Sequence, residues 1–293
     1  MLSIIIPIGS LSRDESNLKK ILTGLERFQS LEIILVFDFD VNLDNNHEFE
    51  HMMVEEGVKI VKTKVRNPNQ ARLAGFRAAS SEHIIFCDSD DYFDLPVLNE
   101  IAKGLRDSQA VCFFPFDQMN FETLENEKSN KRVSYINIIQ APGLWRTIIP
   151  RAVLKNDFFI PTKMGEDMAL LCCVLLSSHE ILFDDRKFYK YVQRVSGNLS
   201  SSKNPEEYLK TIYEFTRLMK KYVQTVELNS ILASGIYFSF VVSTLKWTKI
   251  ENWKEVFTFI KRGVTSNYRL GICIGVSLPV VFLVKFSMIR NVK

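Results

Sequence analysis

The chain has 293 residues, of which 46% are hydrophobic and 24% are charged. This composition excludes a globally disordered protein, and the length suffices for one large domain or for one domain and a second, smaller domain. The formal net charge of +3 is too small to indicate a nucleic-acid partner. The charge is nevertheless uneven, because residues 256–293 contain no acid and have these basic residues: Lys261, Arg262, Arg269, Lys285, Arg290 and Lys293.

The cysteine pattern and the amino terminus both favour a cytoplasmic protein. The cysteines form no C-x-x-C pair and lie mostly within apolar runs, which favours reduced thiols over disulfides or metal ligands. They are Cys87, Cys112, Cys172, Cys173 and Cys273. Residues 1–7 lack a basic region and are too short for a signal peptide.

Apolar runs alternate with helix-like segments along the first third of the chain. Runs at 3–8, 32–37, 58–61 and 84–87 are typical of buried strands, and helices are expected between them at 14–28, 42–56 and 67–79. This alternation predicts an α/β fold with a mostly parallel sheet flanked by helices. The carboxyl ends of parallel strands gather at one edge, where ligands bind. Here that edge is expected to hold residues 7–10, Asp38 and the acids at 88–91.

Three acids follow the fourth predicted strand within four positions: Asp88, Asp90 and Asp91. Carboxylates this close repel one another strongly, so a divalent cation or hydrogen bonds usually hold them. Hard oxygen ligands favour Mg²⁺ or Mn²⁺, which often bridge protein carboxylates to substrate phosphates. The alternative is a plain solvated turn in which Asp91 or Asp94 caps the next helix.

A second pair of acids lies further along the chain. Between the two acidic segments we expect a helix at 95–105, a strand at 110–114, a polar loop or hairpin tip at 121–131 and a strand at 132–139. Glu166 and Asp167 then open an almost wholly apolar helix, where negative charge favours the helix dipole. Because capping explains only one of them, the pair is also a candidate general base.

A turn-rich stretch at 196–203 predicts a boundary between a domain of residues 1–202 and a C-terminal helical region of residues 203–293. That region has two uncharged runs, 228–245 and 270–284. As a helix the second run would reach roughly 22 Å, short of a hydrocarbon core of about 30 Å. Its basic flanks favour helices that lie on an anionic membrane surface. Packing on the first domain, a homodimer interface and a true span are the alternatives.

Five ordered segments of the predicted first domain resemble the family 2 glycosyltransferases of the GT-A fold. They are residues 3–7, 32–38, 71–75, 88–91 and 165–167, the last two reading D-S-D-D and G-E-D. The resemblance implies a Rossmann-like, mostly parallel sheet flanked by helices. The C-terminal helices lie beyond the resemblance and are expected, from their apolar runs and basic flanks, to be a membrane-associating extension.

The resemblance also implies a nucleotide site at the strand ends, made by these residues: Pro7, Ile8, Asp38, Arg72 and Asp88. In the Asp-x-Asp (DXD) pair, Asp90 would bind Mn²⁺ or Mg²⁺ directly, and Asp88 would contact the ribose or a metal-bound water. Asp167 would be the general base that takes a proton from the acceptor hydroxyl. The residues on the acceptor and diphosphate side would be Glu166, Trp145, Tyr191, Arg194 and Ser200.

The implied activity is inverting, metal-dependent transfer of a sugar from a UDP-linked donor to a hydroxyl of a saccharide or lipid-linked saccharide. The setting would be bacterial surface-polysaccharide synthesis, with the protein peripheral on the cytoplasmic face of the cell membrane. Three alternatives stay open: a non-catalytic sugar-nucleotide-binding or scaffold protein, a nucleotidyltransferase, and a phosphatase like the haloacid dehalogenases. The last rests on residues 35–40, which resemble that family's nucleophile motif around Asp38 and Asp40.

Overall fold

The computed structural model describes residues 1–23, 25–38, 47–105, 108–120, 126–129, 133–193, 205–247, 258, 260–262, 265–267, 269–275 and 277. The chain forms two compact units. Residues 1–133, 144–159 and 182–195 make the first, and residues 134–143, 160–181 and 196–293 make the second. All five cysteines are free and buried, as the sequence indicated.

The first unit is built on a mostly parallel sheet whose strands follow the order β10-β6-β9-β4-β1-β2-β3. The strands are β1 (Leu2–Ile8), β2 (Leu31–Phe37), β3 (Lys59–Lys62), β4 (His83–Phe86), β6 (Val111–Phe113), β9 (Thr147–Pro150) and β10 (Ile181–Phe183). β1 pairs in parallel with β2 and β4, and β2 with β3, while β9 runs antiparallel to both β4 and β6. The predicted α/β sheet is therefore confirmed.

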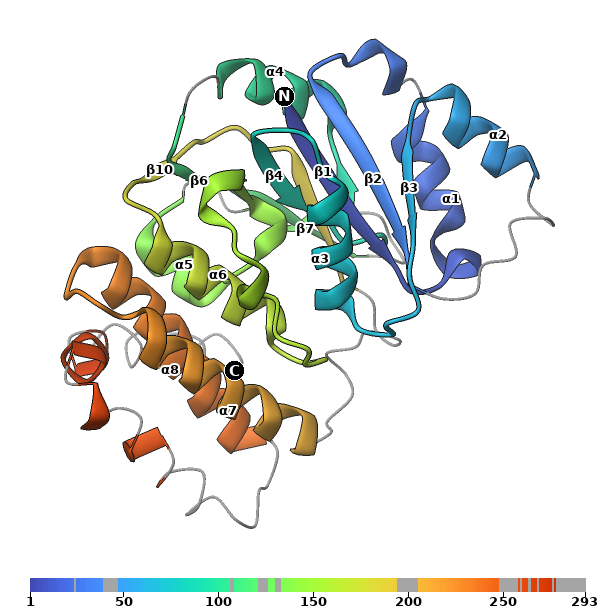
Figure 1. Cartoon of the computed structure of the whole chain (residues 1–293). Helices are drawn as coiled ribbons and strands as arrows, with labels where there is room; N and C mark the ends of the chain where they lie inside the picture. The colour runs from blue at the N-terminus through green and yellow to red at the C-terminus, as the bar shows by residue number, and fades with distance from the viewer. Residues whose placement is uncertain are drawn as a thin grey trace. The chain divides into compact units, whose positions relative to one another are not determined.

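Helices join the parallel strands near the predicted places, although the first starts and ends several residues earlier than the predicted range of 14–28. They are α1 (Leu11–Leu22), α2 (His47–Glu55), α3 (Pro68–Ala78) and α4 (Leu95–Gly104). α3 packs across β1 and β2 (Figure 1). The two layers approach so closely that a Cβ at Gly75 would lie 2.4 Å from Ile5 Cγ2 and 2.9 Å from Val36 Cγ2. The contact needs glycine, because any side chain there would have to displace a buried strand residue.

A second, smaller sheet completes this unit in the order β5-β11-β7-β8. Its strands are β5 (Tyr92–Phe93), β7 (Phe116–Asn120), β8 (Asn126–Ser129) and β11 (Tyr189–Gln193). β7 and β8 pair antiparallel, so residues 126–129, which were expected in a loop or hairpin tip at 121–131, form a strand instead, while residues 121–125 lie outside the described residues. β11 pairs in parallel with β7 and antiparallel with β5, so it lies directly beside the segment that follows the acids.

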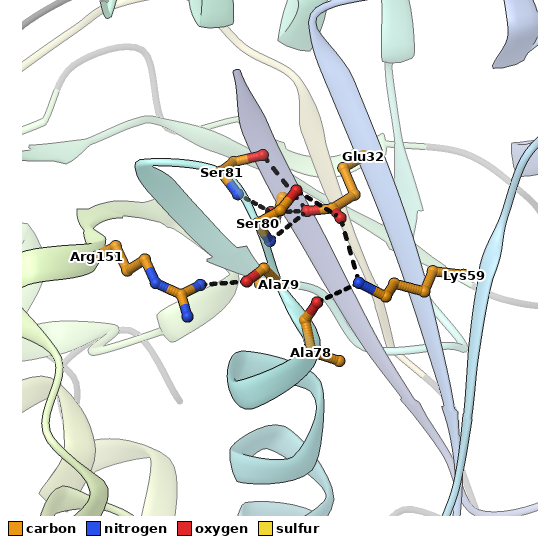
Figure 2. Close-up of polar contacts among 8 residues, drawn as sticks. Glu32, Lys59, Ala78, Ala79, Ser80, Ser81 and Arg151 are labelled. Carbon is orange, nitrogen blue, oxygen red and sulfur yellow. Dashed lines mark hydrogen bonds and ion pairs between the residues drawn. The ribbon is translucent and has the colours of Figure 1, made fainter.

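Glu32, at the amino end of β2, holds the amino ends of neighbouring strands together (Figure 2). This is the end of the strands away from the edge expected to bind ligands. Its carboxylate accepts a hydrogen bond from Ser3 Oγ, and two more, each of 2.9 Å, from the backbone N–H and the hydroxyl of Ser80. Burial alone would raise the pKa of Glu32, but these bonds, with the charge of Lys59, lower it overall. Glu32 therefore links β1, β2 and the loop before β4.

Two cations satisfy the last carbonyls of α3 in the same region (Figure 2). Lys59 Nζ donates to the carbonyl of Ala78 and Arg151 Nη1 to that of Ala79, each at 2.5 Å. Cations stabilise a helix C-terminus because they satisfy its unpaired carbonyls and its dipole. The end of α3 is thus held on the sheet, which orients the other end of the helix toward the ligand-binding edge.

Replacing Glu32 with Gln is expected to destabilise the protein by about 1–3 kcal/mol, because Ser3 and Ser80 lose a charged hydrogen-bond acceptor. A carboxylate whose folded-state pKa is lowered stabilises the protein above its ordinary pKa and loses that effect as pH falls through the lowered value. The difference in free energy of unfolding between the parent and the variant, measured by urea denaturation, should therefore shrink from neutral pH toward acid pH. Glu100→Gln is the control, since its pair with Lys103 is exposed. A difference in free energy of unfolding that stays constant with pH would contradict the stabilising role of the Glu32 carboxylate.

The second unit is helical, with α5 (Tyr135–Gln140), α6 (Glu166–Ser177), α7 (Pro205–Tyr222) and α8 (Leu228–Trp247). α6 packs against α7 and α8, and α5 packs against α8. The uncharged run at 228–245 forms the core helix of this unit, and its buried side chains are Leu232, Ala233, Ile236, Tyr237, Phe240 and Val241. Within the described residues, no helix combines the length and the apolar character needed to cross a bilayer.

The prediction of a strand at residues 132–139 is wrong, because the described part of this segment contains α5. Ser134 caps the helix by accepting a hydrogen bond from the backbone N–H of Asn137. Ile138 and Ile139 are buried, and Gly235 of α8 approaches Ile139 closely. Tertiary packing and the serine cap therefore overrode the β propensity of this isoleucine-rich segment.

Candidate functional site

The ends of β1, β2 and β4 meet at one edge of the large sheet. Ile8 lies opposite Phe37 in the register, and the N–H of Asp38 donates to the carbonyl of Ile8 at 3.0 Å. On the other side of β1, the N–H of Cys87 donates to the carbonyl of Ile5 at 3.0 Å. The expected edge is confirmed, because the end of β1, Asp38 and the acids after β4 emerge from adjacent strands.

The acid turn comprises residues 88–91, and its side chains alternate in direction. Ser89 and Asp91 are 4% and 1% exposed, whereas Asp88 and Asp90 are half-buried. The N–H of Asp91 donates to the carbonyl of Asp88 at 3.2 Å, which closes the turn. The two accessible carboxylates are therefore those of the predicted Asp-x-Asp pair.

Asp91 has a structural position that the sequence did not reveal. Its Oδ2 accepts a hydrogen bond of 2.6 Å from Tyr189 Oη, and its Oδ1 accepts one of 2.7 Å from the N–H of Val192. Burial raises the pKa of Asp91 well above its usual range, and the charges of Asp88 and Asp90 add to this. Asp91 thus attaches the acid turn to β11. The helix cap after the turn is Asp94, which accepts from the N–H of Val97 in α4.

Arg72 of α3 lies against the acid turn. Its Nη2 is 3.2 Å from Asp88 Oδ1, and its side chain is largely buried. α3 begins at Pro68 with Asn67 as its cap, whose side chain accepts from the N–H groups of Asn69 and Gln70. The predicted cap and first-turn proline are confirmed, and they place Arg72 one turn into the helix, beside Asp88.

The carboxylate of Asp38 holds the loop between β3 and α3. It accepts hydrogen bonds from Thr63 Oγ1 at 2.9 Å, from the N–H of Arg66 at 2.8 Å and from the N–H of Asn67 at 2.7 Å. Arg66 has a φ of 48°, a strained value for a residue with a side chain. Both oxygens of Asp38 are therefore engaged in shaping the loop next to the end of β1.

Aromatic rings lie beside the acid turn, from the smaller sheet and from the segment Leu144–Arg146 before β9. Trp145 stacks on Tyr189 and Tyr191 with centroid distances of 4.9 Å and 5.5 Å, and Phe116 meets Trp145 edge on at 4.6 Å. Trp145 and Tyr191 are half-buried, whereas Tyr189 is fully buried. The structure thus brings together two predicted site residues, Trp145 and Tyr191. Arg194 and Ser200 lie outside the described residues.

Glu166 and Asp167 belong to the second unit, where they open α6 as predicted. Gly165 precedes them with a φ of 71°, and a Cβ on it would lie 2.4 Å from the ring of Phe240. Glu166 is buried. The partial burial of Tyr208 raises the pKa of its hydroxyl, and the negative charge of Glu166 raises that pKa further. Asp167 is half-buried in the first helical turn. Glycine is needed at 165 both for its backbone conformation and for space.

The donor set suits a metal ion that a substrate helps to hold. Among the described residues, no group of three or more His, Cys, Asp or Glu side chains could hold a metal ion. The acid turn presents two carboxylates, Asp88 and Asp90, both hard oxygen donors. Mg²⁺ and Mn²⁺ are commonly bound by one or two carboxylates together with substrate phosphates, so these residues fit such an ion.

Comparison with known proteins identifies the class. A model of "Glycosyl transferase family 2" matches residues 3–164, more than half of the chain. The chain therefore belongs to glycosyltransferase family 2, a family of sugar-transferring enzymes. This decides against the phosphatase and the nucleotidyltransferase among the alternatives.

Two similar proteins come from bacteria. The structure of TarS 1-349 from S. aureus in complex with UDP-GlcNAc superposes with a TM-score of 0.68 at 17% identity, over 99% of this chain and 92% of that one. Its likeness supports the GT-A fold. "Glycosyltransferase GlyA" of Streptococcus pneumoniae is 20% identical over 224 residues, or 68% of this chain. The match spans only 31% of GlyA, so this chain corresponds to about a third of that protein.

Proposed function

We propose that this glycosyltransferase moves a sugar from a UDP-linked donor to a hydroxyl of a saccharide or lipid-linked saccharide, with a divalent cation and with inversion at the sugar carbon. The observation that carries the proposal is the acid turn, which presents Asp88 and Asp90 beside Arg72 at the carboxyl edge of the sheet. The structures of TarS with UDP-GlcNAc and with UDP support a UDP donor.

The chemistry explains why these residue types are needed. UDP is the leaving group, so negative charge grows on its phosphate oxygens as the bond to the sugar carbon breaks. Asp90 and Asp88 would hold Mn²⁺ or Mg²⁺, which when bound neutralises that charge. Arg72 is beside Asp88 and would contribute a fixed positive charge that can pair with phosphate.

The uridine would lie at the ends of the first two strands. Pro7 and Ile8 end β1, and Asp38 adjoins Ile8 through a backbone hydrogen bond. By fixing Arg66 and Asn67, Asp38 makes this side of the site rigid before the nucleotide binds. Such preorganisation reduces the entropy lost on binding.

The acceptor would be activated by Asp167. Its half-buried carboxylate can take the proton of a hydroxyl, which is otherwise a weak nucleophile. Glu166 and the ring of Trp145 would contact the acceptor, while Tyr191, Arg194 and Ser200 would approach the diphosphate. Attack from the side opposite the leaving group inverts the sugar carbon.

We place the reaction at the cytoplasmic face of a bacterial membrane, in the synthesis of a surface polysaccharide. Exposed apolar side chains at Val226, Leu228 and Ile272, with the cations Arg262 and Arg269, support contact with anionic lipid. A homodimer would compete for the same apolar surface.

The test is release of UDP from a panel of UDP-sugars, with saccharide acceptors, in the presence of Mn²⁺ or Mg²⁺ and of vesicles of anionic lipid. We expect turnover of at least one donor, loss of turnover with a chelator, and flotation with anionic but not neutral vesicles. Binding of UDP without any turnover would favour the non-catalytic alternative. Failure to float would remove the membrane from the proposal and leave the transferase.

A further inference from the structure

The buried face of α1 includes polar residues that the expected mechanism does not use. Asp14 and Asn17 are 0% and 6% exposed, and they share this face with the apolar residues Leu18 and Ile21. α1 starts three residues after the end of β1, where the uridine would lie. Buried polar groups are costly unless they make hydrogen bonds, so these two residues need an explanation.

Asn17 holds the backbone of the acid turn. Its Nδ2 donates to the carbonyl of Ser89 at 2.9 Å and to the carbonyl of Asp91 at 2.8 Å. Both acceptors are carbonyls, so the amide orientation is fixed by the contacts themselves. The other end of the amide, Oδ1, is buried and has no hydrogen-bond partner among the described residues. Asn17 therefore ties the backbone of the acid turn to α1 through two hydrogen bonds.

Asp14 holds the same turn through a side chain. Its Oδ2 accepts a hydrogen bond of 2.6 Å from Ser89 Oγ. Ser89 is thus bonded through its carbonyl to Asn17 and through its hydroxyl to Asp14. It lies between Asp88 and Asp90, so fixing Ser89 inward directs both neighbours outward. Asp91 holds the other side of the turn on β11.

We propose that Asn17 and Asp14 are positioning residues, which hold the acid turn in the conformation that lets Asp88 and Asp90 bind a divalent cation. This inference rests on the proposed function. It makes α1 part of the metal site although no residue of the helix is expected to touch the metal. It also connects the end of β1 to the acid turn, so that the uridine and the cation would be held by one rigid assembly.

A matched pair of asparagines tests the inference. Asn99 of α4 is 7% exposed and, like Asn17, has a buried Oδ1 without a partner. Asn17→Ala and Asn99→Ala therefore remove the same group from similar burial, and of the two it is Asn17 that donates hydrogen bonds to the acid turn. The readouts are the affinity for UDP with and without Mn²⁺, by calorimetry, and hydrogen exchange of the amides at 88–91.

In Asn17→Ala, the gain in UDP affinity that Mn²⁺ provides is expected to fall by about tenfold or more, since residues that orient metal ligands typically have effects of this size. UDP affinity without metal should stay near that of the parent, and exchange at 88–91 should accelerate. Asn99→Ala should change neither readout. If Asn17→Ala does not fold, Ser89→Ala, which removes only the hydroxyl held by Asp14, is expected to shift both readouts in the same direction.

Parent-like metal dependence and parent-like exchange in Asn17→Ala would overturn the inference, as would equal changes in Asn99→Ala. If the parent shows no gain with Mn²⁺, the metal part of the proposed function fails. Exchange at 88–91 then still decides whether α1 fixes the turn, and slow exchange retained in Asn17→Ala would overturn the positioning role.

Discussion

The Asp167→Asn variant is expected to bind UDP as the parent does and to transfer sugar about 10²–10⁴-fold more slowly, which is the usual contribution of a general base. Asn has nearly the same shape as Asp and keeps an oxygen in the first turn of α6, so the fold should persist. It cannot accept a proton at neutral pH, and the acceptor hydroxyl would remain a poor nucleophile. Release of UDP in the presence of acceptor measures the loss, and calorimetry checks the retained binding.

The control for Asp167→Asn is Glu206→Gln. Glu206 is an acid in the first turn of α7, in the same unit, so its removal reproduces the loss of a favourable helix-dipole interaction. Transfer by this control should be close to that of the parent. If Asp167→Asn keeps most of its transfer activity, the general base must be another residue.

The Asp90→Asn variant is expected to lose metal binding. Changes in residues that only orient metal ligands cost about 10–100-fold in metal affinity, so losing a direct carboxylate ligand should cost at least the upper end of that range. Asp90 is half-buried and lies outside the bonds that Asp91 makes to β11, so the turn itself should remain. Electron paramagnetic resonance of Mn²⁺, titrated with protein and UDP, measures the bound fraction.

Asp94→Asn is the matched control for Asp90. It removes a carboxylate close by in the sequence, but Asn caps a helix about as well as Asp, so the bond to Val97 should survive. Its Mn²⁺ binding should be unchanged. Mn²⁺ bound by Asp90→Asn as tightly as by the parent would show that Asp90 is not a ligand.

The sheet and its ligand-binding edge could be predicted because the signals are local. Residues 3–8 and 32–37 are short apolar runs that stop at polar or turn residues, and they became β1 and β2. Asn67 and Pro68 mark a helix start by their own chemistry, independent of the rest of the fold. The accessible acids Asp88 and Asp90 followed from the same logic, since charge directly after a buried strand tends to reach the surface, whereas Asp91 is buried.

The remaining features depend on contacts between distant parts of the chain. Nothing in the sequence near Asp14 or Asn17 indicates that they make hydrogen bonds to Ser89. Two polar residues within the apolar face of α1 were nevertheless a signal that could have been noticed. The uncharged run at 228–245 has the same composition whether it contacts lipid or protein. Only its packing against α6 shows that α8 is the core helix of its unit. The isoleucines of α5 likewise allowed either strand or helix.

Calorimetric titration of the full chain with UDP, in the presence and absence of Mn²⁺ and at constant ionic strength, tests the central claim most directly. The account predicts weak binding without metal and a clear gain with Mn²⁺, and the gain should disappear in Asp90→Asn while UDP binding without metal is retained. The same affinity with and without Mn²⁺, or no binding of UDP under either condition, would contradict a metal-assisted UDP-sugar site at the acid turn.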